Sequence, residues 1–178
     1  SQSPTFSGAT SEVFTTSRSL TLSGEDGVQT VYLRVTDQAG NFTDGSDTIL
    51  LDRDRPSGAA ISLSPASYTK NVQVTGLLSV QGAQKMCLYG DIVGGSADNC
   101  VNAGWVDFAA SQPLTLSAGD GMKTVSVKYR DRALWETAPV SATVILDGTV
   151  PATGTVSISA GQTHTRDLAV NLTLSASD

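Results

Sequence analysis

Apolar and polar residues alternate in short runs along this chain, as in residues 31–35 and again in residues 125–129. A period of two puts every second side chain on the same face of an extended strand, so each run predicts a β-strand with one face on a core. Pairs such as Asp-Gly, Gly-Asn and Ser-Pro separate the runs and are typical of turns. Because no stretch shows a helical period, the pattern predicts an all-β protein.

The strand pattern occurs twice. Residues 20–37 return without a gap as residues 114–131, and each copy continues into a strand that ends Leu-Asp and is followed by a proline, Pro56 or Pro151. A period of roughly 95 residues is too long for a solenoid unit and is typical of separate domains in a linear array. The repeat therefore predicts a duplicated module.

Each copy has a turn at both ends of its main alternating strand. Gly27 and Gly121 follow an aspartate just before this strand. Glycine adopts positive φ without steric cost, so we expect both to occupy tight turns that set strand register. The second turn reads Asp-Gln-Ala-Gly-Asn from Asp37 but Asp-Arg-Ala-Leu-Trp from Asp131, so we expect this turn to differ between the copies.

One complete module and two partial modules fit the chain. Residues 56–150 hold about seven predicted strands, as many as one small β-sandwich needs. Residues 1–55 match only the second half of this module, and residues 151–178 match only its first two strands. The seven strands of the complete module are expected at residues 59–63, 72–80, 84–89, 105–108, 114–117, 123–130 and 140–146.

The two partial modules are complementary, since each contains strands that the other lacks, apart from a short third strand that we place at residues 5–7. A half-sandwich by itself exposes unpaired backbone groups and an apolar face. Two explanations stay open: the chain is an excerpt of a longer array, or it is a subunit whose last two strands complete the open half-module of the next subunit. Because such a contact runs head to tail, copies of the chain would form an open filament.

The charge and hydropathy of the chain argue against some classes of binding partner. The chain carries 17 acidic and 11 basic residues, with a net charge of −6. It has no basic cluster that would follow a phosphate backbone, which argues against nucleic acid as a partner. It also lacks an apolar run of about 18 residues, so we expect no membrane insertion. The expected partners are copies of the chain or adjacent modules of the same kind.

Cys87 and Cys100 flank a loop that is rich in glycine. Either they form a disulfide that closes this loop or they are two free thiols. Disulfides persist in oxidising compartments, and the other features of the chain suggest such a compartment, so we predict the bond. Two distant thiols without a nearby histidine do not make a metal site.

Trp105 and Trp135 are the candidate binding residues. Trp105 follows Cys100 closely and is most simply a core residue, with a platform for stacking carbohydrate as the alternative. Trp135 lies in the turn that departs from the first copy. An exposed tryptophan beside a groove would favour binding, whereas burial of both in the core would favour a structural role.

Calcium is the one ligand that the acidic residues suggest. Asp52 and Asp54 place two carboxylates at the junction before Pro56, and oxygen ligands at junctions stiffen some surface arrays. Arg53 and Arg55 offer an alternative, since they would neutralise these carboxylates in exposed ion pairs of little energetic weight. The second junction keeps only one of the two acids, so the sequence does not repeat the site, and we expect no other cofactor.

Catalytic chemistry finds little support in the sequence. The only histidine is His164, in a predicted turn, and no nucleophile elbow, phosphate-binding glycine loop or zinc-binding helix motif occurs. Asp91 and Asp98 share the glycine-rich loop, where we expect them to be solvated charges instead of a general acid and base. We therefore expect the chain not to be an enzyme.

The motifs of the repeat resemble the bacterial immunoglobulin-like or fibronectin-III-like tandem repeats of large secreted or cell-surface proteins. The resemblance covers the whole chain and rests on Asp-Gly-x-x-Thr-Val, Asp-x-Ala-Gly-Asn and a strand that ends Leu-Asp-x-x-x-Pro. Residues 85–88, Cys100 and residues 105–108 are similar to a cysteine-bearing variant of these repeats. The resemblance implies tandem immunoglobulin-like β-sandwich modules and an extracellular or cell-surface location, in a prokaryote.

Three functions fit these observations. The first is a structural repeat without catalytic activity in an extracellular filament, sheath or stalk, with strands donated between neighbours. The second is a cell-surface adhesin that uses the loops at residues 90–104 and 132–137 to contact a partner. The third is a spacer or carbohydrate-binding module of a secreted enzyme.

Overall fold

The computed structural model describes residues 1–177, and Asp178, at the end of the last predicted partial module, lies outside the described residues. The chain divides into two compact units. The first comprises Ser1–Arg55 together with Asp131–Trp135, and the second comprises the rest of the described chain. The predicted module boundaries at residues 55/56 and 150/151 remain a prediction, because this division follows contacts and not the repeat.

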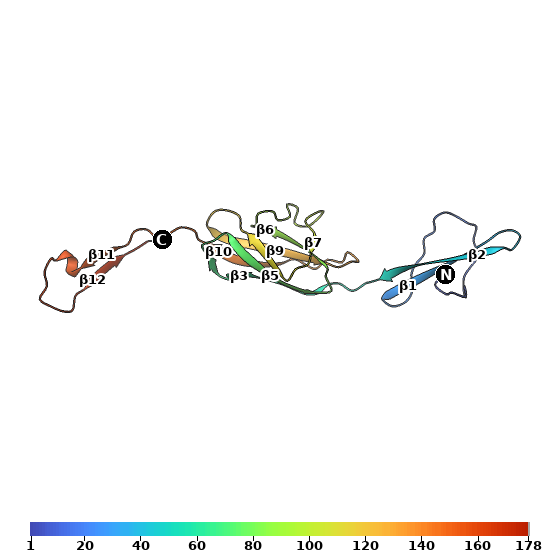
Figure 1. Ribbon diagram of the computed structural model, residues 1–178, viewed down its shortest axis with the longest axis horizontal. Coiled ribbons are helices and arrows are strands. Elements are labelled where there is room, and N and C mark those ends of the chain that lie inside the picture. Colours follow the sequence, from blue (N-terminus) through green and yellow to red (C-terminus); the bar gives the residue numbers. More distant parts are fainter. Residues whose placement is uncertain (178) are drawn as a thin grey trace. The chain divides into compact units, whose positions relative to one another are not determined.

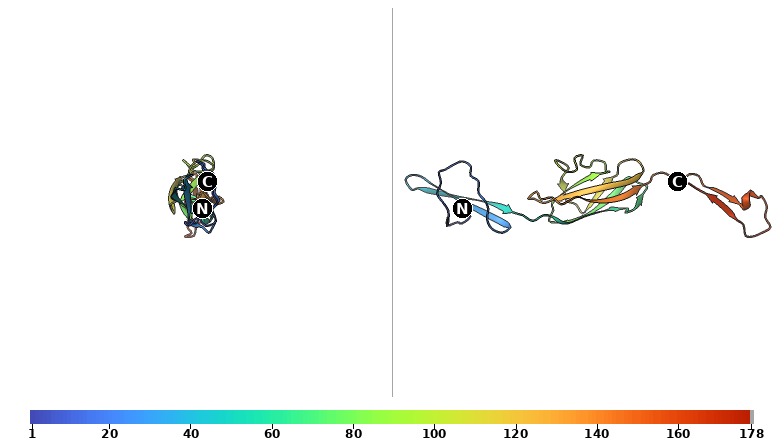
Figure 2. Two further views of the ribbon diagram at one scale, coloured as in Figure 1. Left: turned by 90° about the vertical axis from the view of Figure 1, so that its right-hand side faces the viewer. Right: turned by 180° about the vertical axis from the view of Figure 1, so that it is seen from behind.

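Two sheets build a sandwich from residues 57–146, and all their strands pair antiparallel except β4, which pairs in parallel with β10. The three-stranded sheet has the order β3-β5-β8, and the five-stranded sheet has the order β4-β10-β9-β6-β7. Figures 1 and 2 show these sheets as the two layers of one sandwich. The strands are β3 (Ser57–Ser64), β4 (Tyr68–Thr69), β5 (Gln73–Gln81), β6 (Lys85–Gly90), β7 (Val106–Asp107), β8 (Ser111–Thr115), β9 (Gly121–Arg130) and β10 (Val140–Leu146). The prediction of an all-β, immunoglobulin-like sandwich is confirmed, with the short β4 as an additional strand.

The core of the sandwich follows from the alternation in the sequence. Val125, Val127 and Tyr129 of β9 are fully buried, and they contact residues of the facing three-stranded sheet such as Leu63 and Leu78. Burying a side chain of this size stabilises the fold by roughly 1.5–3 kcal/mol. The same alternation that predicts the strand thus also supplies the cohesion between the two layers.

Tyr129 carries a hydroxyl into this core. The hydroxyl donates a hydrogen bond of 2.7 Å to the backbone oxygen of Ala60 in the opposite sheet. Burial raises the pKa of Tyr129 to about 12, so the group stays neutral and remains a donor. The bond therefore ties the two sheets together without leaving a buried polar group unpaired.

A hairpin of β1 (Gly27–Thr36) and β2 (Phe42–Leu51) forms the regular part of the first unit. Asp37 caps its turn: one carboxylate oxygen accepts from the amides of Ala39 and Asn41, and the other accepts from the Asn41 side chain at 2.8 Å. These bonds, that of the Asn41 side chain first, hold the pKa of Asp37 below its ordinary value. Gly40 completes the turn with a φ of 91°.

The corresponding turn between β9 and β10 keeps this conformation without the Gly-Asn pair. Asp131 accepts from the amide of Trp135 at 2.9 Å, as Asp37 does from Asn41. Leu134 takes the place of Gly40 and has a φ of 70°. The two turns therefore share the aspartate cap and differ in their side-chain contacts, because Trp135 stands where Asn41 bonds to Asp37 in the first copy. A leucine in the left-handed region is held there at a cost of about 1–2 kcal/mol.

A second hairpin follows the sandwich. It contains β11 (Thr155–Ile158), a short 3-10 turn η1 (Ser159–Gly161) and β12 (Leu172–Ser175). The third strand that we expected at residues 5–7 is absent, since these residues form turns. Instead, the backbone of Ser1 pairs with Tyr32 in β1, with an amide-to-oxygen distance of 2.7 Å.

The φ of Gly121 is 122°, which supports the expected role of the Asp-Gly pair, and a Cβ atom there would meet nothing within 4 Å. Replacing Gly121 with alanine therefore tests backbone conformation alone. We expect Gly121→Ala to lower the free energy of unfolding by about 1–3 kcal/mol. Met122→Ala is the matched control on the next position of β9, because Met122 is 70% exposed and its φ is not positive. Equal midpoints of the two variants in urea denaturation would contradict this role of Gly121.

Candidate functional site

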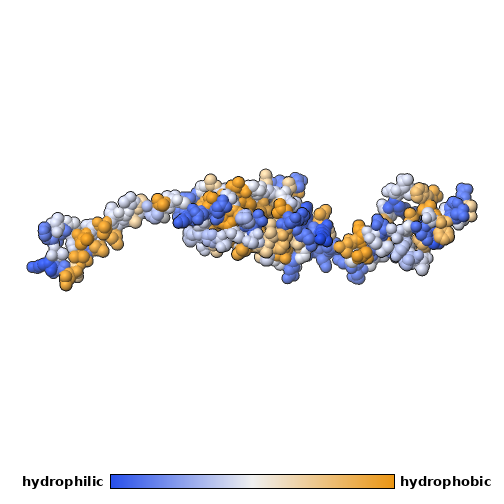
Figure 3. Space-filling model, viewed as in Figure 1, coloured by the Kyte–Doolittle hydropathy of each residue, from blue (hydrophilic) through white to orange (hydrophobic). Residues whose placement is uncertain are grey.

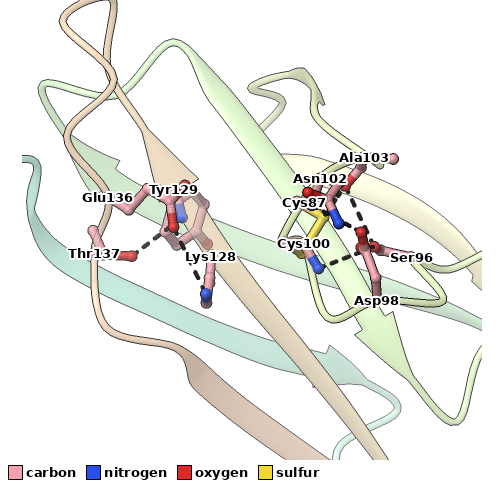
Figure 4. The surroundings of a disulfide bond; sticks show 10 residues. All are labelled: Cys87, Ser96, Asp98, Cys100, Asn102, Ala103, Lys128, Tyr129, Glu136 and Thr137. Atoms are coloured by element: carbon pink, nitrogen blue, oxygen red, sulfur yellow. Dashed lines mark hydrogen bonds and ion pairs between the residues drawn. A yellow bond between two sulfur atoms is a disulfide. The ribbon is translucent and has the colours of Figure 1, made fainter.

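Cys87 in β6 and Cys100 in the following loop form a disulfide, the pairing that the sequence predicts (Figure 4). Their Cα atoms are 6.0 Å apart, and both residues are fully buried. Gly104 closes the loop in a position where a Cβ atom would lie 2.7 Å from the Cβ of Ser96. The disulfide joins the loop to β6, and Gly104 allows the loop to pack closely on itself.

Asp98 organises the loop inside the disulfide. Its carboxylate accepts from the Ser96 hydroxyl at 2.7 Å and from the amide of Asn102 at 2.8 Å (Figure 4). The Ser96 hydroxyl oxygen in turn accepts from the amide of Cys100 at 3.0 Å. These bonds, with the Ser96 hydroxyl as the main donor, lower the pKa of Asp98 from its ordinary value.

The expectation that Asp91 and Asp98 are merely solvated loop charges was wrong. Asp91 accepts from the backbone amide of Thr124 in β9 at 2.8 Å and thereby fastens the start of the loop to the sheet. Both carboxylates satisfy backbone donors that would otherwise lack partners, which is the ordinary structural use of aspartate in a loop. Neither arrangement resembles a general acid and base.

Each of the two tryptophans carries an arginine on its ring, and neither belongs to the hydrophobic core. The Arg130 guanidinium lies 4.2 Å from the centre of the Trp105 ring, and the Arg55 guanidinium lies 4.1 Å from that of Trp135. Both tryptophans are half-buried. Trp105 is therefore not the core residue that we expected, because it is only half-buried and its ring lies against the guanidinium of Arg130.

An open hollow of about 620 Å³ lies beside the disulfide loop. Leu88, Ile92, Val106 and Leu114 supply its apolar walls, and neither tryptophan lines it. A carbohydrate platform needs an aromatic face beside such a hollow, and here the faces carry guanidinium groups. The binding roles of Trp105 and Trp135 remain a prediction without support from this geometry.

Trp135 also contacts the segment that precedes Pro56. Its indole Nε1–H donates to the backbone oxygen of Asp52 at 3.3 Å, and Arg55 covers its ring. A cation–π contact of this kind contributes about 0.5–1 kcal/mol at an exposed site. The turn with the left-handed leucine thus places its tryptophan against the junction segment.

A second contact at a junction follows β10. Asp120, the aspartate before Gly121, accepts from the amide of Gly148 at 2.8 Å and from the Thr149 hydroxyl at 2.5 Å. Both bonds lower the pKa of Asp120, and the bond from the Thr149 hydroxyl has the larger effect. We call this aspartate and the junction residues that it holds a junction clamp.

The first copy contains the same clamp. Asp26 corresponds to Asp120 in the repeat and accepts from the backbone amide of Arg53 at 2.9 Å, and then from its guanidinium. The backbone bond is the main reason that the pKa of Asp26 is lowered. Sequence reasoning assigned the Asp-Gly pairs to turns only and missed the clamp. The one sign of the clamp in the sequence is that both copies have an aspartate before the glycine.

Arg53 and Arg55 do not neutralise Asp52 and Asp54, as the alternative to calcium supposed. Arg53 pairs with Asp26, and Arg55 stacks on Trp135. Asp52 accepts from the amide of Asp54 at 3.2 Å. Within residues 1–177, no group of three or more acidic, histidine or cysteine side chains could hold a metal ion. The calcium site therefore remains a prediction that this geometry does not support.

His164 has no catalytic arrangement among the contacts of the described chain. Its ring Nδ1 lies 2.9 Å from the hydroxyl of the neighbouring Thr163, at an exposed position. In the part of the chain that the structure describes, no helix is long and apolar enough to cross a bilayer.

The terminal hairpins carry uncovered apolar residues (Figure 3). Leu33 in β1 is 56% exposed, whereas Val127, its counterpart in the repeat, is fully buried. Leu174 in β12 is 69% exposed, whereas its counterpart Leu78 is 5% exposed. Each hairpin therefore presents a face that the complete module buries in its core.

Both hairpins also keep the strand register of the complete module. Gly27 lies opposite Leu51 in the first hairpin, as Gly121 lies opposite Leu146 in the sandwich. Val156 lies opposite Leu174 in the second hairpin, as Ile61 lies opposite Leu78. The uncovered faces therefore have the apolar pattern of sandwich halves.

No family model matches the chain, and no curated protein matches it. A comparison with solved structures finds fibronectin(III)-like modules of Clostridium thermocellum CbhA, with a TM-score of 0.41 and 14% sequence identity. The match covers 69% of this chain and 64% of the other, so this chain spans less than two thirds of that structure. At these values the likeness adds nothing to the assignment of a site.

The disulfide leads to a prediction about stability. Closing a loop of this length contributes up to about 3 kcal/mol in the chain-entropy model. We expect the Cys87→Ala/Cys100→Ala variant to unfold with a free energy about 2–3 kcal/mol lower and to be cleaved faster by protease within residues 91–104. Urea denaturation and mass spectrometry of the cleavage products measure both effects. Cleavage that speeds up equally in the strands would contradict a local role of the bond.

The junction clamp leads to a prediction about pH. Because the pKa of Asp120 is lowered in the folded chain, its contribution to stability is present above the unfolded pKa of about 3.9 and is lost as the pH falls through the lower folded value. We expect the amide signal of Gly148 in NMR spectra to titrate with a midpoint below that value. Asp120→Asn is the control and should remove the titration. A midpoint at or above the ordinary value would show that the clamp does not form.

Proposed function

We propose that this chain is a structural repeat without catalytic activity in an extracellular filament, sheath or stalk that is built from immunoglobulin-like modules. The observation that carries the proposal is the repetition of one structural plan along the chain. The complete sandwich and both hairpins use the same strand registers, and the same junction clamp occurs after β2 and after β10.

The clamp supports a mechanical role. Asp26 and Asp120 bind backbone amides of the residues that follow the last strand of each copy. Such bonds stiffen the path of the chain where it leaves a module, and a stalk or filament requires this stiffness of its junctions. The contact of Trp135 with the segment at Asp52 acts in the same way at the first junction.

The disulfide supports the location. A fully buried bond between Cys87 and Cys100 forms in an oxidising environment and is unusual in the cytosol. The net charge of −6 favours solubility and gives no reason to expect nucleic acid as a partner. The partners that we propose are copies of the chain or adjacent modules, in contact head to tail.

Immunogold electron microscopy of the source cells tests the proposal. Antibodies raised against the whole 178-residue chain should label fibrous or sheath-like material outside intact cells. Permeabilised cells are the control for hidden antigen. Label that appears only after permeabilisation would overturn the extracellular role, and label on compact secreted particles without fibres would overturn the structural one.

A further inference from the structure

The two terminal hairpins correspond to opposite sheets of the sandwich. By the repeat, β1 and β2 are the counterparts of β9 and β10 in the five-stranded sheet. By the same repeat, β11 and β12 are the counterparts of β3 and β5 in the three-stranded sheet. In the sandwich these two pairs of strands face each other across the core. One hairpin therefore has the shape and pattern that the other needs to cover its apolar face.

The core positions agree in detail. In the sandwich, Leu63 and Val74 from one sheet pack with three residues of the other, namely Val125, Val144 and Leu146. Their counterparts in the terminal hairpins are all apolar and all uncovered or half-buried: Ile158 and Val170 on one side, and Val31, Ile49 and Leu51 on the other. No polar residue interrupts either set.

One strand of the composite is absent from the isolated chain. In the sandwich, β8 pairs with the free edge of β5, and Pro113 lies opposite Thr75. The counterparts of β8 are residues 17–21, which form no strand and leave Leu20 52% exposed. By the repeat, they would pair with the free edge of β12 and with Asn171, the residue just before it, so that Ser19 lies opposite Asn171.

The hairpin that fills the open face belongs to a second copy, because the same molecule cannot supply it without strain. The short β4 follows β3 and pairs with the last residues of β10, so β3 ends near the point where β10 ends. The start of β3, where the first hairpin is attached, therefore lies at the other end of the sandwich. A strand such as β3 spans about 25 Å. The linker before β3 is held by the bond between Arg53 and Asp26 and by the contact of Arg55 with Trp135. The clamp at Asp120 holds Gly148 and Thr149, which leaves residues 150–154 to bridge this length with a reach of about 17 Å.

We propose that the β11–β12 hairpin of one copy covers the β1–β2 face of a second copy, and that residues 17–21 of the second copy become a strand on the edge of β12. The inference rests on the proposed function and specifies how its head-to-tail contact is made. In a composite formed by two copies of this chain, Ser1 pairs with the edge of β1 that corresponds to the β6 edge of β9. We expect this association of purified copies to be reversible and to depend on concentration.

Single charges placed on the two faces of β1 test the proposal. Leu33→Asp puts a carboxylate in the composite core, because its counterpart Val127 is fully buried. Val28→Asp is the matched control on the same strand: Val28 is 71% exposed, and its counterpart Met122 remains 70% exposed in the sandwich. Sedimentation of the full chain should show a mass that rises with concentration for the wild type and Val28→Asp, and a monomer for Leu33→Asp.

Two outcomes of this experiment would overturn the proposal. A wild-type chain that stays monomeric at all concentrations excludes the contact. Equal effects of Leu33→Asp and Val28→Asp would show that the chains associate through non-specific hydrophobic contacts and not through the face of β1 that carries Leu33. An unchanged thermal transition of the central sandwich in each variant confirms that the comparison concerns folded protein.

Engineered cysteines test the register. Residues directly opposite each other on paired strands have Cα atoms about 4.5–5.5 Å apart, which a disulfide can bridge. Ser19→Cys/Asn171→Cys should therefore give a ladder of linked chains on a non-reducing gel. Ser19→Cys/Asp167→Cys is the control, because four residues along a strand displace the second thiol by about 13 Å. A ladder from both variants would overturn the proposal. A disulfide that forms only within single chains, without a ladder, would also overturn it.

These results separate the inference from the proposed function. Absence of association would leave a structural array in which neighbouring residues of a longer polypeptide complete each half-module. Immunogold label confined to the cell interior would overturn the proposed function whatever the association of the purified chain shows.

Discussion

The structure depends on closing two apolar sheet faces over one core. In the complete sandwich, the alternating residues of β9 are fully buried because a second sheet lies over them. The same alternation in β1 leaves Leu33 more than half exposed, because the first unit has no facing sheet. Since burial of apolar area supplies most of the free energy of folding, the association that we propose would bury this uncovered face.

The junctions are the second element of the design. An aspartate before each main strand binds the backbone just beyond the last strand of the same copy, as in Asp120 with Gly148. The carboxylate is exposed, so its hydrogen bonds direct the path of the chain more than they stabilise the core. Because both copies contain this clamp, each module fixes the path of the first residues that follow its own last strand.

The turn after β9 shows how a module adapts without losing its backbone. Leu134 adopts the left-handed conformation that Gly40 has in the first copy, and the aspartate cap is kept. The change brings in Trp135, which contacts Asp52 and Arg55 of the junction segment. The strained Leu134 thus lies beside a residue that makes a new contact at the junction. Strained backbone positions are frequent near functional sites.

Alternation and repetition in the sequence determined the strands, the sandwich class, the buried positions of β9 and the disulfide, because these features depend on the period of the chain and on residues close in sequence. Tertiary structure alone decided the partners of the charged and aromatic side chains. Trp135 and Asp52 are 83 residues apart, and Asp26 and Arg53 are 27 apart. No local pattern encodes which of several aspartates meets an amide at such a distance, since the folded backbone brings the donor there.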